Sequence, residues 1–258
     1  MELRRSASRP WVLAHRGASA HAPENTLRAF DRAVADGADG VELDVRLSRD
    51  GVVVVAHDPD LMRVAGHPEA IASLDAATLR TIDVGGDTVP SLDEVIDLLG
   101  PRGARINVEV KGDVPDRMAL VRAVARTLGR RSEAAREALF VSSFRPEVLL
   151  GLRALRAHVP LAFLFDDAHT GPLRAAWLRR VVVPDGLHPE HTLCTPGAVG
   201  RWHRRGLFVN AWTVDDAARV RALDAAGVDG LITNDPRAVL AALAGRCGTA
   251  REGGVERR

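Results

Sequence analysis

The chain has 258 residues, and its hydrophobic share of 46% and charged share of 27% are ordinary for a globular protein with an apolar core. Its 35 Lys and Arg residues face 34 Asp and Glu residues, which leaves a net charge of +1. A protein that binds nucleic acid or an anionic membrane usually carries a larger positive excess, so neither partner is predicted.

The two ends of the chain differ in composition from the rest. Residues 1–10 carry arginines without an apolar stretch behind them, so we expect a flexible segment and no secretory signal. Residues 246–258 are rich in glycine and charge and are also expected to be flexible. Since no apolar run is long enough to cross a bilayer, we expect a cytoplasmic protein without stable membrane insertion. Cys194 and Cys247 lie in no metal-ligand spacing, which predicts two reduced thiols.

Short β-branched runs alternate with amphipathic helical patterns along the chain. The predicted strands span 11–15, 40–47, 105–111, 139–143, 160–165, 181–188, 207–214 and 230–233. The predicted helices span 25–36, 91–99, 115–129, 145–157, 172–180, 196–205, 215–226 and 236–244. Eight strands, each followed by a helix, predict an α/β fold with a single (β/α)₈ TIM-barrel domain over residues 11–245.

Several predicted helices begin with a recognisable start signal. Asn25 and Ser91 are residue types that cap helices, and a proline follows Thr195 and Asp235 at the first helical position. The segment 58–90 interrupts the alternation and is predicted to be a small insertion after the second strand. A doubly wound open sheet is the competing architecture, but the first strand is not followed by the glycine-rich phosphate loop typical of that fold.

Acidic and basic side chains lie at the carboxyl ends of the predicted strands. Because side chains alternate across a strand, Glu42 and Asp44 share one face, and Glu109 and Lys111 share one face of the next strand. His57 continues the face of the apolar run before it. In a (β/α)₈ barrel the carboxyl ends of the strands carry the active site.

Each of these features also has a purely structural interpretation. Glu42 and Asp44 alone are typical of the wet side of an antiparallel strand, and Glu109 with Lys111 is typical of a solvated ion pair. A single histidine such as His57 is usually a hydrogen-bonded structural residue. The coincidence of all of them at strand ends instead favours one common site.

Three converging carboxylates would repel one another and raise one another's pKa values in the absence of a cation. A hard divalent cation, Mg²⁺ or Ca²⁺, prefers oxygen ligands and would relieve this repulsion. We therefore predict Glu42, Asp44 and Glu109 as metal ligands. Zinc is disfavoured because its sites usually contain His or Cys.

The remaining polar groups predict an anionic substrate. Arg16 can hold phosphate oxygens with two hydrogen bonds, and Lys111 adds a point charge. Gly17 allows a close approach of the backbone at the turn after the first strand. His15 and His57 can divide the proton transfers, one removing a proton from the attacking group and the other donating one to the leaving oxygen. Together these residues are suited to cleaving a phosphodiester.

Six stretches in order resemble the glycerophosphodiester phosphodiesterase family. They are HRGASAHAPENTLRAF (15–30), GADGVELDVRLSRDGVVVVAHD (37–58), VPSLDEVIDLL (89–99), NVEVK (107–111), NAWTV (210–214) and GVDGLITNDP (227–236). The resemblance covers residues 11 to 242 and implies a (β/α)₈ barrel with a small insertion after the second strand. It also implies hydrolysis of a small-molecule glycerophosphodiester to glycerol 3-phosphate and an alcohol with the help of a divalent cation.

The resemblance also implies roles for individual residues. The roles are a catalytic pair at His15 and His57, phosphate contacts at Arg16 and Lys111, metal ligands at Glu42, Asp44 and Glu109, and an aromatic pocket wall at Trp212. Packing at the barrel rim is the alternative interpretation of Trp212.

Four further residues are assigned by default. Asn25 is expected to cap the first helix, and Glu24 and Asn25 could also brace the loop or a metal-bound water. His188 and His191 are expected at the rim of the barrel, with a place on the alcohol side of the site as the alternative.

Three alternative functions stay open at this point: a lysophospholipase D-like activity on a lipid diester, a non-catalytic barrel that binds a phosphate ligand, and metal-assisted enolisation. The sequence also leaves open whether water or a hydroxyl group of the substrate attacks the phosphorus.

Overall fold

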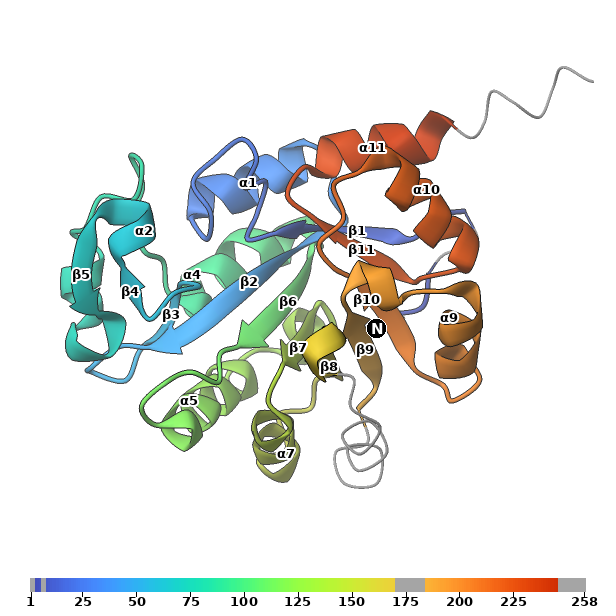
Figure 1. The fold of residues 1–258 in the computed structure, drawn as a ribbon. Helices are drawn as coiled ribbons and strands as arrows, with labels where there is room; N and C mark the ends of the chain where they lie inside the picture. Colours follow the sequence, from blue (N-terminus) through green and yellow to red (C-terminus); the bar gives the residue numbers. More distant parts are fainter. Residues whose placement is uncertain (1–2, 6–7, 170–183, 246–258) are drawn as a thin grey trace, which may run out of the picture.

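The computed structural model describes residues 3–5, 8–169 and 184–245. Eight parallel strands follow one another around a closed barrel, in which β1 pairs with both β11 and β2 (Figure 1). The barrel strands are β1 (Trp11–His15), β2 (Gly40–Leu47), β6 (Arg105–Val110), β7 (Leu139–Ser143), β8 (Leu161–Phe165), β9 (Gly186–Pro189), β10 (Phe208–Ala211) and β11 (Gly230–Thr233). The predicted (β/α)₈ barrel is therefore confirmed.

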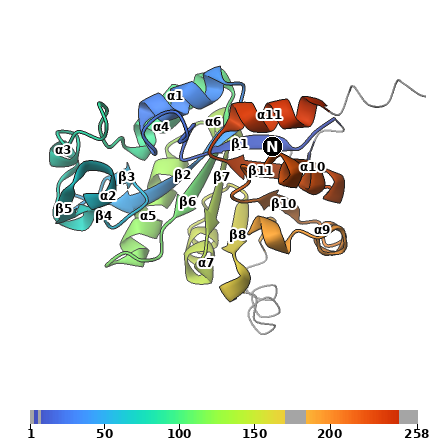
Figure 2. The same ribbon diagram turned by 45° about the horizontal axis from the view of Figure 1, so that its top comes forward.

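Helices cover the outside of the barrel, as both views show (Figures 1 and 2). The helices that follow the barrel strands are α1 (Leu27–Ala35), α4 (Leu92–Leu99), α5 (Arg117–Gly129), α6 (Glu133–Glu137), α7 (Pro146–Ala154), α9 (Pro196–His203), α10 (Ala217–Ala226) and α11 (Pro236–Ala244). The predicted helix at 172–180 lies outside the described residues. None of the helices in the described ranges is long and apolar enough to cross a membrane.

The predicted start signals are confirmed at three of these helices. Ser91 forms a capping box with Glu94 at the start of α4. Thr195 and Asp235 cap α9 and α11 through their side chains, and proline occupies the first turn of both helices. These caps satisfy backbone N–H groups that a helix cannot satisfy internally, so they fix where each helix begins.

The insertion follows a short antiparallel strand, β3 (Val53–Val55), which pairs with the end of β2. It contains β4 (Asp60–Leu61), α2 (Met62–Ala65), β5 (His67–Ala70) and α3 (Ala76–Leu79). Leu61, Ile71 and Leu79 are almost completely buried and belong to a small apolar cluster under this segment. The cluster anchors the insertion beside the carboxyl end of the barrel, at the left of Figure 1.

Alternating side chains along β2 point in opposite directions, one set into the apolar core and the other toward the mouth of the barrel. Val41, Leu43 and Val45 point outward into the main apolar cluster under the helices, whereas Glu42 and Asp44 point inward. Burial of each such aliphatic side chain contributes about 1.5–3 kcal/mol to the free energy of unfolding, so the register of β2 is strongly fixed.

A layer of apolar side chains fills the barrel below these carboxylates. The layer consists of Leu13, Phe140, Ala162, Phe208 and Ile232, together with Leu3 from the N-terminal segment. The segment also donates from Arg5 to Asp224, at 2.8 Å, and from Arg9 to Asp39. The polar side chains of the barrel mouth lie above this apolar layer, at the carboxyl end.

Candidate active site

The three predicted acidic ligands come together at the carboxyl end of neighbouring strands. Asp44 on β2 is the direct register partner of Glu109 on β6, and Glu42 lies one pleat below Asp44. All three side chains are buried, and one carboxylate oxygen from each lies within 4.8 Å of the others. This convergence follows from the alternation of side chains in two paired parallel strands.

The electrostatics of the acidic cluster fit a divalent cation. Burial and the neighbouring carboxylates raise the pKa of Glu42 well above its usual range, and burial also raises the pKa of Glu109. Burial opposes the ionisation of Asp44 too, but Lys111 and Arg16 lower its pKa to about 2. A compact set of buried oxygen donors under mutual repulsion is the arrangement that a hard cation stabilises.

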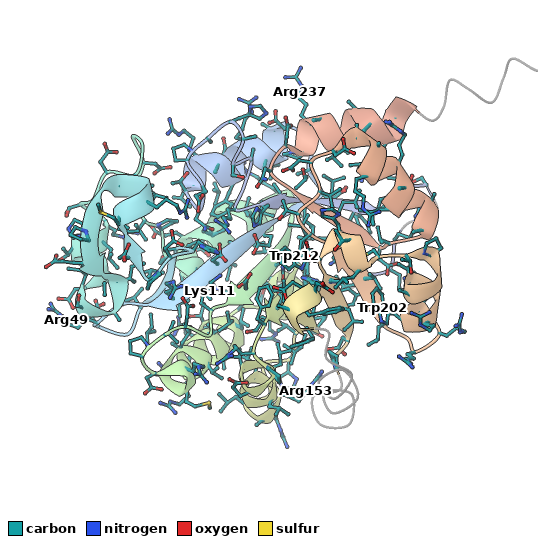
Figure 3. All side chains as sticks on the ribbon, viewed as in Figure 1. Arg49, Lys111, Arg153, Trp202, Trp212 and Arg237 are labelled. Carbon is teal, nitrogen blue, oxygen red and sulfur yellow. The ribbon has the colours of Figure 1, made fainter. Side chains whose placement is uncertain are left out.

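Lys111, the only lysine in the sequence, lies against the acidic cluster. Its ammonium group donates to Asp44 at 3.2 Å and to Glu109 at 2.9 Å. Burial opposes its charge, but these two carboxylates raise the pKa of Lys111, so that it stays protonated. Figure 3 shows Lys111 within the mouth of the barrel, in the same region as Trp212.

Arg16 lies on the other side of the acidic cluster, with its backbone in the left-handed region at a φ of 56°. Its N–H donates to Glu42 at 3.2 Å, its Nε lies 3.3 Å from Asp44, and its NH1 donates to Glu24 at 2.9 Å. Gly17 follows with a φ of 83°, and a Cβ there would come within 2.6 Å of Ala29 in α1. The glycine therefore lets this turn pack directly onto α1.

Both predicted histidines line one cavity, and each is held through Nδ1. His15 Nδ1 lies 2.7 Å from the side-chain oxygen of Asn234, whose amide nitrogen donates to Asp215 at 2.6 Å. That second bond fixes the orientation of the amide, so His15 Nδ1 is the donor. His57 Nδ1 donates to Asp58 at 2.7 Å.

In both rings Nε2 is therefore the nitrogen that carries a lone pair in the neutral form. Burial lowers the pKa of His15 and of His57, which favours this neutral form.

The cavity measures about 220 Å³ and spans the mouth from the acidic cluster to an aromatic wall. The wall contains Phe144 and Trp212, which meet edge to face with centroids 5.6 Å apart. Trp212 Nε1 donates to the backbone oxygen of His188 at 2.7 Å, and the same ring packs on the apolar layer below. Trp212 thus lines the cavity and also packs within the barrel, and its contact with a substrate stays a prediction.

Two expectations about individual residues are wrong. Thr26, and not Asn25, caps α1 by accepting from the N–H of Ala29. Asn25 adopts a left-handed φ of 58° and donates from its amide to Asp44 at 2.9 Å, so it orients a carboxylate of the cluster. Asparagine tolerates this backbone conformation better than most residues, which is the signal that sequence reasoning missed.

The rim placement of His188 is also wrong, because this residue lies in the barrel interior, where it lines the cavity. Its side chain is completely buried, Nε2 lies 3.1 Å from the amide nitrogen of Asn210, and the ring contacts Phe140 edge to face. Burial lowers the pKa of His188 to about 3, which keeps the imidazole neutral. His191 lies outside this cavity, where its Nδ1 accepts from Arg219 at 3.1 Å.

A closed barrel with polar groups gathered at its carboxyl-terminal mouth is the architecture of a (β/α)₈-barrel enzyme. Residues 15–238 match the model of the glycerophosphoryl diester phosphodiesterase family, and the chain belongs to this family of enzymes.

The chain is 30% identical to a glycerophosphodiester phosphodiesterase of Caldanaerobacter subterraneus, over 89% of this chain and 96% of that protein. Two solved structures are also similar. A glycerophosphodiester phosphodiesterase of Thermotoga maritima matches with a TM-score of 0.76 and 30% identity, over 90% of this chain and 97% of that one. A phosphodiesterase of Oleispira antarctica, solved with the product sn-glycerol-3-phosphate, matches with a TM-score of 0.82 and 26% identity, over 92% and 97%. These similarities confirm the family and the fold.

Proposed function

We propose that this chain hydrolyses glycerophosphodiesters to sn-glycerol 3-phosphate and an alcohol. The observation that carries the proposal is one cavity lined by two histidines, two cationic side chains and two carboxylates of a three-carboxylate cluster, in a member of this family. The product complex of the Oleispira relative supports the identity of the phosphate product.

Glu42, Asp44 and Glu109 would hold a divalent cation, Mg²⁺ or Ca²⁺. Their oxygen donors, their burial and the raised pKa values of two of them fit this role. When bound, the cation offsets negative charge on the phosphoryl oxygens in the transition state.

Arg16 and Lys111 bind the phosphate group in this proposal. Both border the cavity, and both already face the acidic cluster, so a phosphate next to that cluster comes within reach of two positive charges. The planar guanidinium suits two phosphate oxygens at once, whereas the ammonium acts as a compact point charge.

His15 and His57 transfer the two protons of the reaction. One ring, neutral, removes a proton through Nε2 from the attacking oxygen as its bond to phosphorus forms. The other ring, protonated at Nε2 for this step, donates that proton to the leaving alcohol oxygen as that bond breaks. The hydrogen bonds from Nδ1 to Asn234 and to Asp58 support this proposal, because they fix each ring and leave Nε2 for the substrate.

A water-soluble diester fits the surface better than a lipid. Among the residues that the structure describes, the exposed large apolar side chains are Met62, Met118 and Leu155. None of the three lines the cavity, so they provide no apolar wall for an acyl chain there. The presence of two oriented histidines in the cavity likewise favours a catalyst over a phosphate-binding barrel.

A release assay tests the proposal. Phosphate-monoester product is followed from glycerophosphocholine and from a lysophospholipid, with chelator and after restoring Mg²⁺ or Ca²⁺. We expect release from glycerophosphocholine that stops with chelator and returns with the cation. Preference for the lysophospholipid would favour the lipid alternative, and turnover that resists chelation would contradict the role of the cation.

A further inference from the structure

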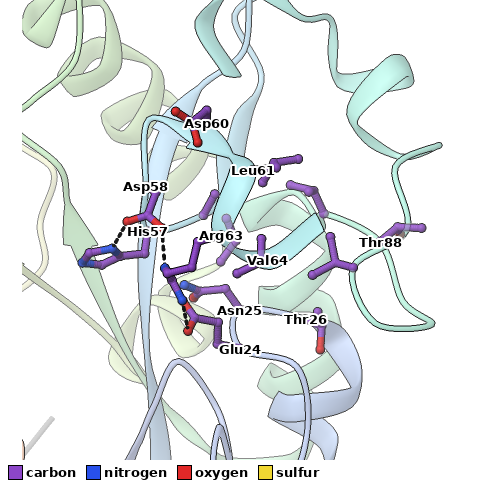
Figure 4. A pocket seen from close by; sticks show the side chains of 14 residues that line it. Glu24, Asn25, Thr26, His57, Asp58, Asp60, Leu61, Arg63, Val64 and Thr88 are labelled. Atoms are coloured by element: carbon purple, nitrogen blue, oxygen red, sulfur yellow. Dashed lines mark hydrogen bonds and ion pairs between the residues drawn. The ribbon is translucent and has the colours of Figure 1, made fainter. Parts of the chain in front are cut away.

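Arg63 connects the insertion to two loops that border the proposed active site. It belongs to α2, the short helix of the insertion, and lies between the loops that carry Glu24 and Asp58 (Figure 4). Its sequence position gives no sign of this connection, because the loop with Glu24 follows β1 and the loop with Asp58 follows β3.

The guanidinium of Arg63 uses three nitrogen atoms on two carboxylates. NH1 and NH2 donate to the two oxygens of Glu24 at 2.8 and 2.7 Å, and Nε donates to Asp58 at 2.7 Å. Because two nitrogens of the guanidinium each meet one oxygen of Glu24, Arg63 orients this carboxylate as well as attracting it.

Each of the two carboxylates also holds a residue of the site. Glu24 Oε1 accepts from NH1 of Arg16 at 2.9 Å, and Asp58 Oδ1 accepts from Nδ1 of His57 at 2.7 Å. One side chain of the insertion therefore braces the proposed phosphate contact and one of the proposed proton-transfer groups, without lining the cavity between them.

Partial burial separates this network from ordinary surface ion pairs. The side chains of Glu24 and Asp58 are 20% and 27% exposed, and Arg63 is 49% exposed. Arg49 offers a contrast, since it makes a similar forked pair with Asp75 under the same insertion, but those side chains are 62% and 37% exposed and contact no residue of the site. The apolar cluster anchors the insertion in either case, so holding it in place does not require Arg63.

We propose that Arg63 is a positioning residue that sets Arg16 and His57 in their reactive orientations through Glu24 and Asp58. This inference rests on the proposed function of those two residues. Arg63 itself does not touch the substrate. Its loss would leave each carboxylate with one partner and free to rotate. The guanidinium of Arg16 and the ring of His57 would then no longer be held in a fixed orientation relative to each other.

The test compares Arg63→Gln, Arg63→Lys and the control Arg49→Gln in the full chain. With glycerophosphocholine and saturating Mg²⁺, we expect Arg63→Gln to lower kcat by about tenfold or more, Arg63→Lys to recover part of the loss, and Arg49→Gln to stay within about twofold of the wild type. Equal kcat values for Arg63→Gln and Arg49→Gln would overturn the proposal.

A double-mutant cycle distinguishes positioning from stability. If Arg63 acts through Asp58, adding Arg63→Gln to Asp58→Asn lowers kcat much less than Arg63→Gln does alone. Full additivity of the two losses would overturn the proposal, even if both variants have lowered Tm values.

A crystal structure of Arg63→Gln tests the inference without an enzyme assay, because it shows directly whether the two hydrogen bonds are kept. We expect Asp58 to move away from its hydrogen bond with His57 and Glu24 from its hydrogen bond with Arg16; either bond retained at its present length would overturn the inference. Failure of the wild type to hydrolyse any glycerophosphodiester would instead contradict the proposed function, whatever this structure shows.

Discussion

Glu42 and Asp44 lie on the same face of β2, yet their pKa values shift in opposite directions. Both are buried, but Asp44 receives Lys111 on one oxygen and Asn25 on the other, whereas Glu42 receives the backbone N–H of Arg16. The strand therefore carries one carboxylate that is firmly ionised and one whose ionisation is unfavourable until a further positive charge is near.

Lys111 is the first residue to test. Lys111→Met leaves Asp44 and Glu109 without their shared cation, so we expect the metal-free protein to lose about 3 kcal/mol or more of unfolding free energy. Mg²⁺ should raise the Tm of this variant by more than it raises that of the wild type, because the ion takes over the neutralisation. Equal Tm increases would show that the ammonium and the ion act independently.

Because the chain has one lysine, its side chain can also be observed directly. Protein labelled with ¹³C at the lysine Cε should give a single folded-state NMR signal, and this signal should shift on addition of Mg²⁺. A signal that does not respond to Mg²⁺ at concentrations that restore turnover would place the ion away from Lys111.

His57→Gln tests the proposed proton transfer. We expect kcat to fall by about 10²–10⁴-fold while the KM for glycerophosphocholine changes little, because the ring moves a proton and Arg16 and Lys111 hold the phosphate. His67→Gln is the matched control, since His67 belongs to the insertion, pairs with Glu69 at 3.7 Å and does not line the cavity. Comparable kcat values in the two variants would contradict the role of His57.

His188 predicts how stability depends on pH. Its folded-state pKa of about 3 is below its ordinary value of 6.5. Between these two values the imidazole is protonated in the unfolded chain but stays neutral in the folded chain. The contribution of His188 to the free energy of unfolding is therefore complete above pH 6.5 and falls as the pH drops toward 3. At about pH 5 the loss reaches up to about 2 kcal/mol.

Urea unfolding of the wild type and of His188→Gln, at about pH 7 and at about pH 5, measures that contribution. We expect the variant to lose less stability on acidification than the wild type, by roughly the same 2 kcal/mol. Substitution of the exposed His158 by Asn is the control. An identical acid dependence in the wild type and His188→Gln would mean that the ring becomes protonated in place.

Local patterns predict most of the fold and the acidic cluster. Alternation alone puts Glu42 and Asp44 on one face of β2, and the parallel pairing of a barrel then brings Glu109 beside them. The strand predicted at 181–188 overlaps β9, which spans Gly186–Pro189, and residues 181–183 of the prediction lie outside the described residues.

Contacts between distant segments escape such reasoning. Asn25 reads as a helix cap in the sequence, and only the closed barrel reveals Asp44 as its partner. The rim is the default assignment for His188 in the sequence, although its ring lies in the barrel interior. Arg63 gains its significance from two loops that approach it in space. In each case tertiary packing outweighs a local preference.

The most direct test of the site is a crystal structure of the chain with Ca²⁺ and sn-glycerol 3-phosphate. We predict one cation bound by Glu42, Asp44 and Glu109, with the phosphate on Arg16 and Lys111. A cation bound elsewhere, or a phosphate that contacts neither of these cationic side chains, would contradict the proposed active site.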